Sequence, residues 1–241
     1  MKFFVYIFLS VLLFASCADD PCLKGSGKTF VETRELPDSI ITFQVTDNLD
    51  VDVYLSDRNY VEIEGGENVV PFIKTEMSDT TLVLENKNGC SFLRNFDHNL
   101  KIRLYLKSIS KFMFDGSGVL NFMDTLKGNE MLVKSMRGSG TINLTVDVNR
   151  IRVSLEDGSV DVHIKGHSYF LNIYCTTTSS IDALDLKSIK CGITTESTGD
   201  CLITAEELID AYIYSIGNIR YRGNPTIQLQ KNTGSGQVIP Y

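Results

Sequence analysis

The sequence lacks any cluster of basic residues. Its 23 lysine and arginine residues are outnumbered by 30 aspartate and glutamate residues, so the formal net charge is −7. A protein that binds nucleic acid through the phosphates needs a basic surface. We therefore expect no nucleic-acid partner.

An apolar run of membrane-spanning length is missing as well. The run from Phe3 to Phe14 has about a dozen residues, whereas a transmembrane helix needs about 20. It follows Lys2 and ends in Phe14-Ala15-Ser16-Cys17, which resembles a bacterial lipobox. This predicts a signal peptide over residues 1–16, lipidation of Cys17 and a polar tether over residues 17–28. The alternative is an ordinary secretory signal with a chance cysteine.

A lipid on Cys17 would attach the protein to a membrane that it does not span. The next residues, Ala18-Asp19-Asp20, resemble the surface-export signal of Bacteroidetes lipoproteins. We therefore expect an outer-membrane lipoprotein of a Gram-negative bacterium, exposed at the cell surface or otherwise facing the periplasm.

The cysteines do not form a disulfide framework. Besides Cys17, five of the six cysteines remain, an odd number with irregular spacing. Cys175, Cys191 and Cys201 alternate with apolar residues and are predicted to be small core residues. Whether Cys22 and Cys90 pair in an oxidising envelope is left open by the sequence.

What the sequence does contain is a repeated turn of small residues. The last small residue of each turn recurs at spacings of 22, 18, 21, 20, 18 and 19: Gly118, Gly140, Gly158, Ser179, Gly199, Gly217 and Gly236. Apolar residues alternate after each turn, as in Leu120 and Phe122 or Val160 and Val162. A period near twenty with one strand and turn per copy is typical of stacked β-coils. Each coil is expected to hold two strands joined by a polar connector, with Ala205–Ala211 as one such connector.

The regular coils are predicted over residues 108–241. Residues 29–107 also alternate like strands, as in Val51, Val53 and Leu55, but lack the clean period. This part is expected to be an irregular N-terminal β region or a cap of the same domain, because the open end of a coil must be covered.

The end of the chain resembles a known family. The segment from Ser215 to Pro225, followed by Gly234-Ser235-Gly236, is similar to the closing motif of the head GIN domain, a family of "putative auto-transporter adhesins" common among Bacteroidetes lipoproteins. The residues that carry the motif are Gly217, Tyr221, Gly223, Pro225, Gly234 and Gly236. Ile216 and the glycine-free Ser179-Ser180 depart from the pattern. The resemblance covers about residues 29–241 and implies a right-handed parallel β-helix, an all-β single-stranded solenoid, in which these residues are structural.

Polar residues recur at the outward positions between the apolar pairs. They are Asn121, Asn143, Asp161, Asp182 and Arg220, and Leu202 interrupts them. Such a face is explained by a solvated sheet surface, by glycan or calcium binding, or by an acid pair for sugar chemistry. We assign no catalytic residues, because no cluster of acids with a basic partner recurs over three adjacent coils. His98, His163 and His167 have no carboxylate or cysteine at ligand spacing, so no metal or cofactor is expected.

Three hydroxyl residues fit a short O-glycosylation pattern of Bacteroidetes envelope proteins, namely Ser39, Thr80 and Thr125. Together these features predict a lipid-anchored, non-enzymatic envelope protein that acts as an adhesin or surface interaction module. Its partner would be a glycan or a host or envelope protein. The alternatives are a carbohydrate-active β-helix enzyme, such as a polysaccharide lyase or hydrolase, and a periplasm-facing scaffold or sensor.

Overall fold

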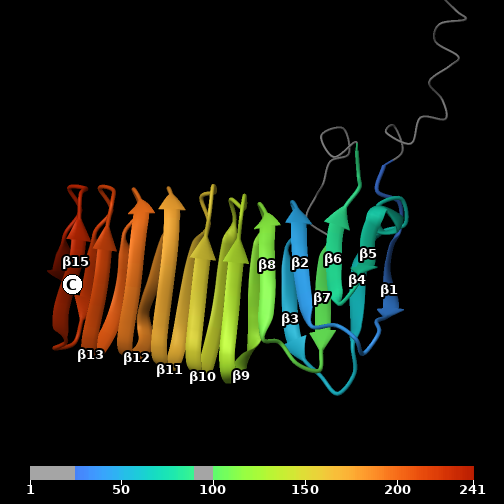
Figure 1. Cartoon of the computed structure of the whole chain (residues 1–241). Helices are drawn as coiled ribbons and strands as arrows, with labels where there is room; N and C mark the ends of the chain where they lie inside the picture. Colours follow the sequence, from blue (N-terminus) through green and yellow to red (C-terminus); the bar gives the residue numbers. More distant parts are fainter. Residues whose placement is uncertain (1–24, 90–99) are drawn as a thin grey trace, which may run out of the picture.

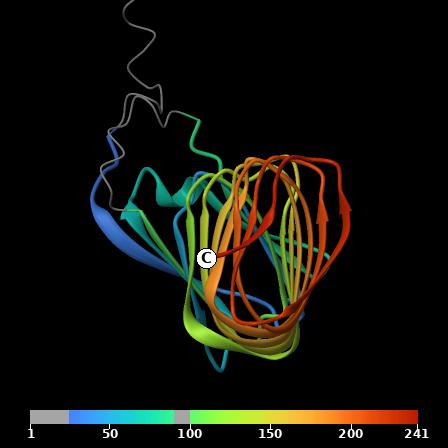
Figure 2. The same cartoon turned by 90° about the vertical axis from the view of Figure 1, so that its left-hand side faces the viewer.

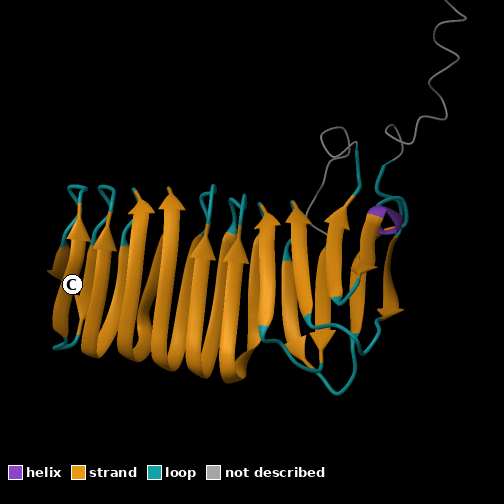
Figure 3. Ribbon diagram, viewed as in Figure 1, coloured by secondary structure: helices purple, strands orange, loops and turns teal. Residues whose placement is uncertain are grey.

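The computed structural model describes residues 25–89 and 100–241, which form a β-solenoid of about six turns with a more irregular N-terminal β region (Figure 1). The strands are β1 (Thr29–Glu35), β2 (Thr42–Asp47), β3 (Val51–Leu55), β4 (Tyr60–Gly66), β5 (Ile73–Ser78), β6 (Thr81–Asn86), β7 (Lys101–Leu106), β8 (Lys111–Gly116), β9 (Val119–Ser135), β10 (Thr141–Leu155), β11 (Asp161–Thr177), β12 (Ser180–Ser197), β13 (Cys201–Ile213), β14 (Ile219–Arg222), β15 (Thr226–Asn232) and β16 (Val238–Pro240). A single short 3-10 helix, Val70–Phe72, interrupts the described strands (Figure 3). Within the described ranges, no helix is both long and apolar enough to cross a bilayer.

The predicted stacked β-coil is confirmed, but its coils are more continuous than expected. Each of β9 to β12 runs through a corner and continues on the opposite side of the coil, so that two legs enclose the interior (Figure 2). The corners are marked by shifts in the parallel register, such as that between His163 and Lys165. The predicted connector Ala205–Ala211 is wrong, because these residues lie inside β13.

The interior is filled by apolar side chains that stack from coil to coil. The first legs contribute one row of almost fully buried residues: Leu120, Ile142, Val162, Ile181, Cys201 and Ile219. Removing these rows from water is the main force that holds the coils together. The register pairs Val162 with Ile142 and Ile164 with Leu144. The sequence pattern had aligned Val160 and Val162 with Ile142 and Leu144. This alignment is wrong by two residues, because the turn before β11 has a different length.

Turn glycines allow the coils to approach one another closely. The Thr141 amide donates a hydrogen bond to the Gly118 carbonyl oxygen at 3.0 Å. A Cβ on Gly140 would lie only 2.0 Å from the same oxygen. Ser179, at the turn that lacks glycine, uses its Oγ to accept the Val160 amide at 3.2 Å. A side chain is tolerated there because it joins the hydrogen bonds of the turn.

The N-terminal region does not stack in sequence order. β2 pairs in parallel with both β6 and β8, and β3 pairs in parallel with both β7 and β9. The β2–β3 coil therefore lies between the strands β6–β7 and the coil that begins with β8. Three buried rings join these coils: Phe112 lies 5.6 Å from Phe43 and 4.6 Å from Phe122, measured between ring centroids.

The far N-terminal end is closed by antiparallel strands. β5 pairs with β6, β4 with β7, and β1 with β4, all antiparallel. Arg34 of β1 reaches across this cap and donates hydrogen bonds to the carbonyl oxygens of Ile73 at 2.5 Å and Val70 at 3.2 Å. Its hydrogen bond to Glu32 lowers the pKa of that carboxyl group. The expectation of an irregular N-terminal β region is confirmed, and its outermost strands cover the open end of the solenoid.

The three cysteines in the described ranges are core residues, as predicted. Cys175, Cys191 and Cys201 are buried free thiols. Burial raises the pKa of Cys191 to about 12. The hydrogen bond with the Cys175 thiol and burial both raise the pKa of Cys201 above that of a free thiol. Cys17, Cys22 and Cys90 lie outside the described residues.

We expect Cys191 to resist alkylation in the folded protein. A thiol with a pKa of about 12 is almost wholly protonated at neutral pH, and the thiolate is the reactive form. Iodoacetamide followed by peptide mass spectrometry should leave Cys191 unmodified in the native protein and modify it fully in urea. Labelling of native Cys191 at the rate found in urea would contradict the buried position.

Candidate functional site

The outward side of the first legs carries a row of polar side chains. Register places Asp52, Asn121, Asn143, His163 and Asp182 side by side on successive strands, and we call these residues the polar row. Leu202 and then Arg220 continue the same line toward the C-terminal end. Sequence reasoning had placed Asp161 where His163 stands. Asp161 also faces outward, but it belongs to the neighbouring line nearer the turn, between Thr141 and Ser180.

The first half of the polar row is ordered by side-chain hydrogen bonds. Asn121 Nδ2 donates to Asp52 Oδ1 at 3.0 Å, and Asn143 Nδ2 donates to Asn121 Oδ1 at 2.9 Å. Each amide is thus oriented by the one before it, which fixes the direction of its dipole. The Asp52 carboxylate is the origin of this ladder, and Asn143 is its last amide.

The second half carries charged groups. His163 Nδ1 lies 3.8 Å from Asp182 Oδ2. Further along, Arg220 Nε donates to Asp200 Oδ2 at 2.8 Å, so Arg220 is held by the neighbouring line instead of by Asp182. Backbone and side-chain hydrogen bonds from Asn218 and the Arg220 contact lower the pKa of Asp200 against the effect of its burial. The structure therefore joins Asn121 with Asn143, and His163 with Asp182, but leaves Arg220 and Asp161 apart from them.

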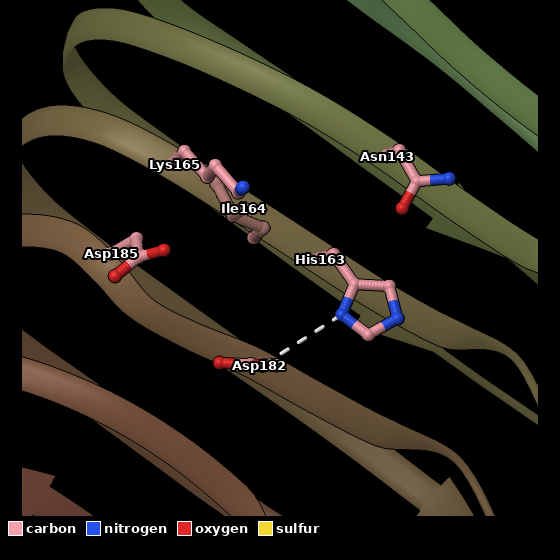
Figure 4. A pocket seen from close by; sticks show the side chains of 6 residues that line it. All are labelled: Asn143, His163, Ile164, Lys165, Asp182 and Asp185. Carbon is pink, nitrogen blue, oxygen red and sulfur yellow. Dashed lines mark ion pairs between the residues drawn. The ribbon is translucent and has the colours of Figure 1, made fainter.

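Two open hollows lie over the polar row. One, of about 370 Å³, is lined by Asn143, His163, Ile164, Lys165, Asp182 and Asp185 (Figure 4). The other, of about 600 Å³, shares Asn143, His163 and Lys165 with it and extends over Asp52, Asn121 and Met123. Lys165 and Asp185 stand opposite each other in the register of β11 and β12. Lys165 and Asp185 could not be predicted from the alternation of apolar residues, because both lie at the corner where this alternation is interrupted.

The hollows offer a regular set of hydrogen-bonding groups at the spacing of neighbouring strands, ~4.8 Å. Amide, imidazole, carboxylate and ammonium groups can bind the polar surface of a partner. One hollow also brings two acids, Asp182 and Asp185, together with the basic Lys165. Both His163 and Asp182 are well exposed to water. In the part of the chain that the structure describes, no group of three or more histidine, cysteine, aspartate or glutamate side chains could hold a metal ion.

The residues of the predicted closing motif lie in the last coil. A Cβ on Gly217 would lie 2.2 Å from the Gly199 carbonyl oxygen, and one on Gly236 would lie 2.1 Å from that of Gly217. Tyr221 packs against the core from β14, and Pro225 directly precedes β15. These positions give the motif a steric role in stacking the final coil.

Some of the predicted modification sites lie in the described ranges and others lie outside them. Ser39, Thr80 and Thr125 are all exposed. Cys17 and most of the tether predicted over residues 17–28 lie outside the described residues.

A family model matches residues 41–225, and its description is "Putative auto-transporter adhesin, head GIN domain". No curated protein matches the chain in sequence.

Several solved structures share the fold. A "putative adhesin" from Bacteroides fragilis is 19% identical, with a TM-score of 0.80 over 90% of this chain and 100% of that one. A "putative adhesin" from Parabacteroides distasonis is 20% identical, with a TM-score of 0.67 over 90% and 99%. A "putative lipid binding protein" from the same species is 22% identical, with a TM-score of 0.66 over 90% and 99%. At these identities the likeness concerns the fold alone.

Proposed function

The chain belongs to the family of putative auto-transporter adhesins with a head GIN domain, and from this premise we propose that it is a non-enzymatic adhesin of the cell envelope. The observation that carries the proposal is the ordered polar row, from Asp52 through Asn121 to Asn143. Side chains that are held in place before a partner arrives lose little conformational freedom on binding. A stiff solenoid surface with oriented amides therefore suits recognition of a glycan or of a host or envelope protein.

We further propose that the adhesin is held at the outer membrane by a lipid on Cys17. The support is the sequence before it, an apolar run too short to span a membrane that ends in the lipobox-like Phe14-Ala15-Ser16-Cys17. The acidic pair Asp19-Asp20 favours the outer face of the cell. The solenoid would then stand on a tether that ends near its capped end.

A carbohydrate-active enzyme is the second candidate. It is favoured by one observation, the presence of Asp182, Asp185 and Lys165 in a single hollow. Glycoside hydrolysis needs two carboxyl groups on either side of the bond that is cleaved. The hollow is open, however, and does not exclude water from its acids, which distinguishes it from a closed catalytic cleft.

The experiment is to express the full chain in a Bacteroides host and to follow its location and binding together. We expect the wild-type protein in the membrane fraction, open to protease on intact cells, and binding of these cells to arrayed glycans or matrix proteins. Cys17→Ala should move the protein to the soluble fraction and abolish the binding of cells.

A Cys17→Ala protein that stays in the membrane fraction would show that the lipid anchor is wrong. Wild-type cells that bind no better than cells without the gene would contradict the adhesin. Release of reducing sugars from a polysaccharide by the purified protein would favour the enzyme instead.

A further inference from the structure

Two tyrosines stand on the opposite side of the solenoid from the polar row, on the second legs of the coils. Register aligns Ser154, Tyr174, Thr194 and Tyr212 on neighbouring strands of β10 to β13. Tyr174 and Tyr212 are 37% and 36% exposed. They are separated by one strand, which places them ~9.6 Å apart along the solenoid axis. Thr194 is the shorter residue between them.

The line beside the tyrosines has a gap in it. Asn172, Gly192 and Asp210 occupy neighbouring positions on β11, β12 and β13. Gly192 carries no side chain, and a Cβ there would meet only the Asn172 Nδ2 at 2.9 Å. The result is a hollow of about 370 Å³ whose lining includes Arg152, Asn172, Tyr174, Gly192, Asp210 and Tyr212. We call it the tyrosine groove.

Asp210 gives the tyrosine groove a polar group that needs a partner. Its Oδ1 is buried and has no hydrogen-bond partner among the residues that the structure describes. A buried acceptor without a hydrogen bond is destabilising. Asp210 also lines the groove, so its carboxylate can accept a hydroxyl hydrogen from a ligand there. Asn172 can donate and accept beside it, at the edge of the gap over Gly192.

These features together select the ligand class. Tyrosine rings offer a flat apolar face with a polar tip, which fits the carbon–hydrogen face of a sugar ring. Carboxylate and amide groups in the line beside the rings fit its hydroxyl groups. The net charge of −7 disfavours a polyanionic chain. A peptide strand cannot add to the sheet here, because β11, β12 and β13 are each paired on both sides.

We propose that the tyrosine groove binds an uncharged, extended oligosaccharide. Tyr174 and Tyr212 stack on two sugars of the chain, and Asp210 and Asn172, in the line beside the rings, bind hydroxyl groups at the edge of these sugars. The proposal rests on the proposed function, since it assigns the glycan partner of the adhesin to one side of the solenoid. The axis of the glycan follows the axis of the solenoid, across the strands.

The test is binding of cellotetraose, chitotetraose and laminaritetraose to the full chain in mild detergent, by calorimetry and by tyrosine fluorescence. The protein contains no tryptophan, so its emission comes from its 10 tyrosines. We expect at least one neutral tetrasaccharide to bind and to change this emission. Tyr174→Ala and Tyr212→Ala should each weaken binding about tenfold, whereas Tyr174→Phe, which keeps the ring, should bind as the wild type does.

Tyr169→Ala is the matched control, because Tyr169 lies on the same strand as Tyr174, is 43% exposed and is not part of the tyrosine groove. It should leave affinity unchanged.

Binding of none of the three sugars, equal loss in Tyr169→Ala, or binding of a heparin fragment alone would overturn the proposal. If cells still bind matrix proteins while no neutral sugar binds, the glycan groove is wrong and the adhesin stands. If a sugar binds this groove but cells adhere to nothing, the groove stands and the adhesin is wrong.

Discussion

Gly166→Ala is expected to lower the free energy of unfolding by about 3–4 kcal/mol. Gly166 lies at the corner of β11 with a φ of +109°, a backbone conformation that favours glycine. A Cβ there would also lie 2.0 Å from the Val146 carbonyl oxygen on the neighbouring coil. This oxygen belongs to backbone that is paired within the sheet, so it cannot move away as the end of a side chain can.

Gly192→Ala provides the matched control for this prediction. Gly192 also lies in a strand of the regular coils, but a Cβ there meets only the end of the Asn172 side chain. We expect its free energy of unfolding to change by less than about 1 kcal/mol. Urea unfolding followed by circular dichroism measures both variants. Equal stability of Gly166→Ala and Gly192→Ala would show that the corner tolerates a side chain.

Phe112→Ala should be as damaging, by about 3–5 kcal/mol. The Phe112 ring is fully buried and lies between Phe43 of β2 and Phe122 of β9. Its removal leaves a cavity at the place where the N-terminal coils join the regular ones. We expect unfolding in urea to begin in the N-terminal region, so that circular dichroism and tyrosine emission, to which the stacked Tyr54, Tyr60 and Tyr105 contribute, no longer change together.

Met123→Ala serves as the comparison, since Met123 follows Phe122 directly but is 54% exposed. Its stability should stay within about 0.5 kcal/mol of the wild type. A single transition by both probes in Phe112→Ala, at the wild-type midpoint, would contradict the role given to the aromatic cluster.

The regular coils could be predicted from the sequence because their signal is local. Alternation fixes which side chains point inward, and small turn residues recur once per coil, so Leu120, Ile142 and Ile181 were placed in the core from spacing alone. Register could not be read from the turns, because turn length varies by two residues before β11. Because of this variation, the sequence pattern predicted Asp161 at the position in the polar row that His163 occupies.

The rest of the architecture depends on contacts between distant residues. Nothing near Phe43 in the chain indicates that β2 lies between β6 and β8. Lys165 and Asp185 could not be predicted as neighbours, because they lie at corners, where the alternation is interrupted. Tyr174 and Tyr212 lie on either side of Thr194. This arrangement depends on the register of the second legs, and the small turn residues that recur in the sequence do not mark where those legs begin.

The displaced position of the β2–β3 coil sets the order in which the molecule can assemble. Along the regular coils, stacked side chains such as Ser168 and Ser188 are 20 residues apart in the chain. Each coil can therefore pack on the preceding coil by closing a loop of only about 20 residues. Asn121 and Asp52 are 69 residues apart, and β2–β3 meets its second neighbour only after β8 and β9 exist. Contacts of greater sequence separation form more slowly. We therefore expect the regular coils to form before the β2–β3 coil takes its place between its two neighbours.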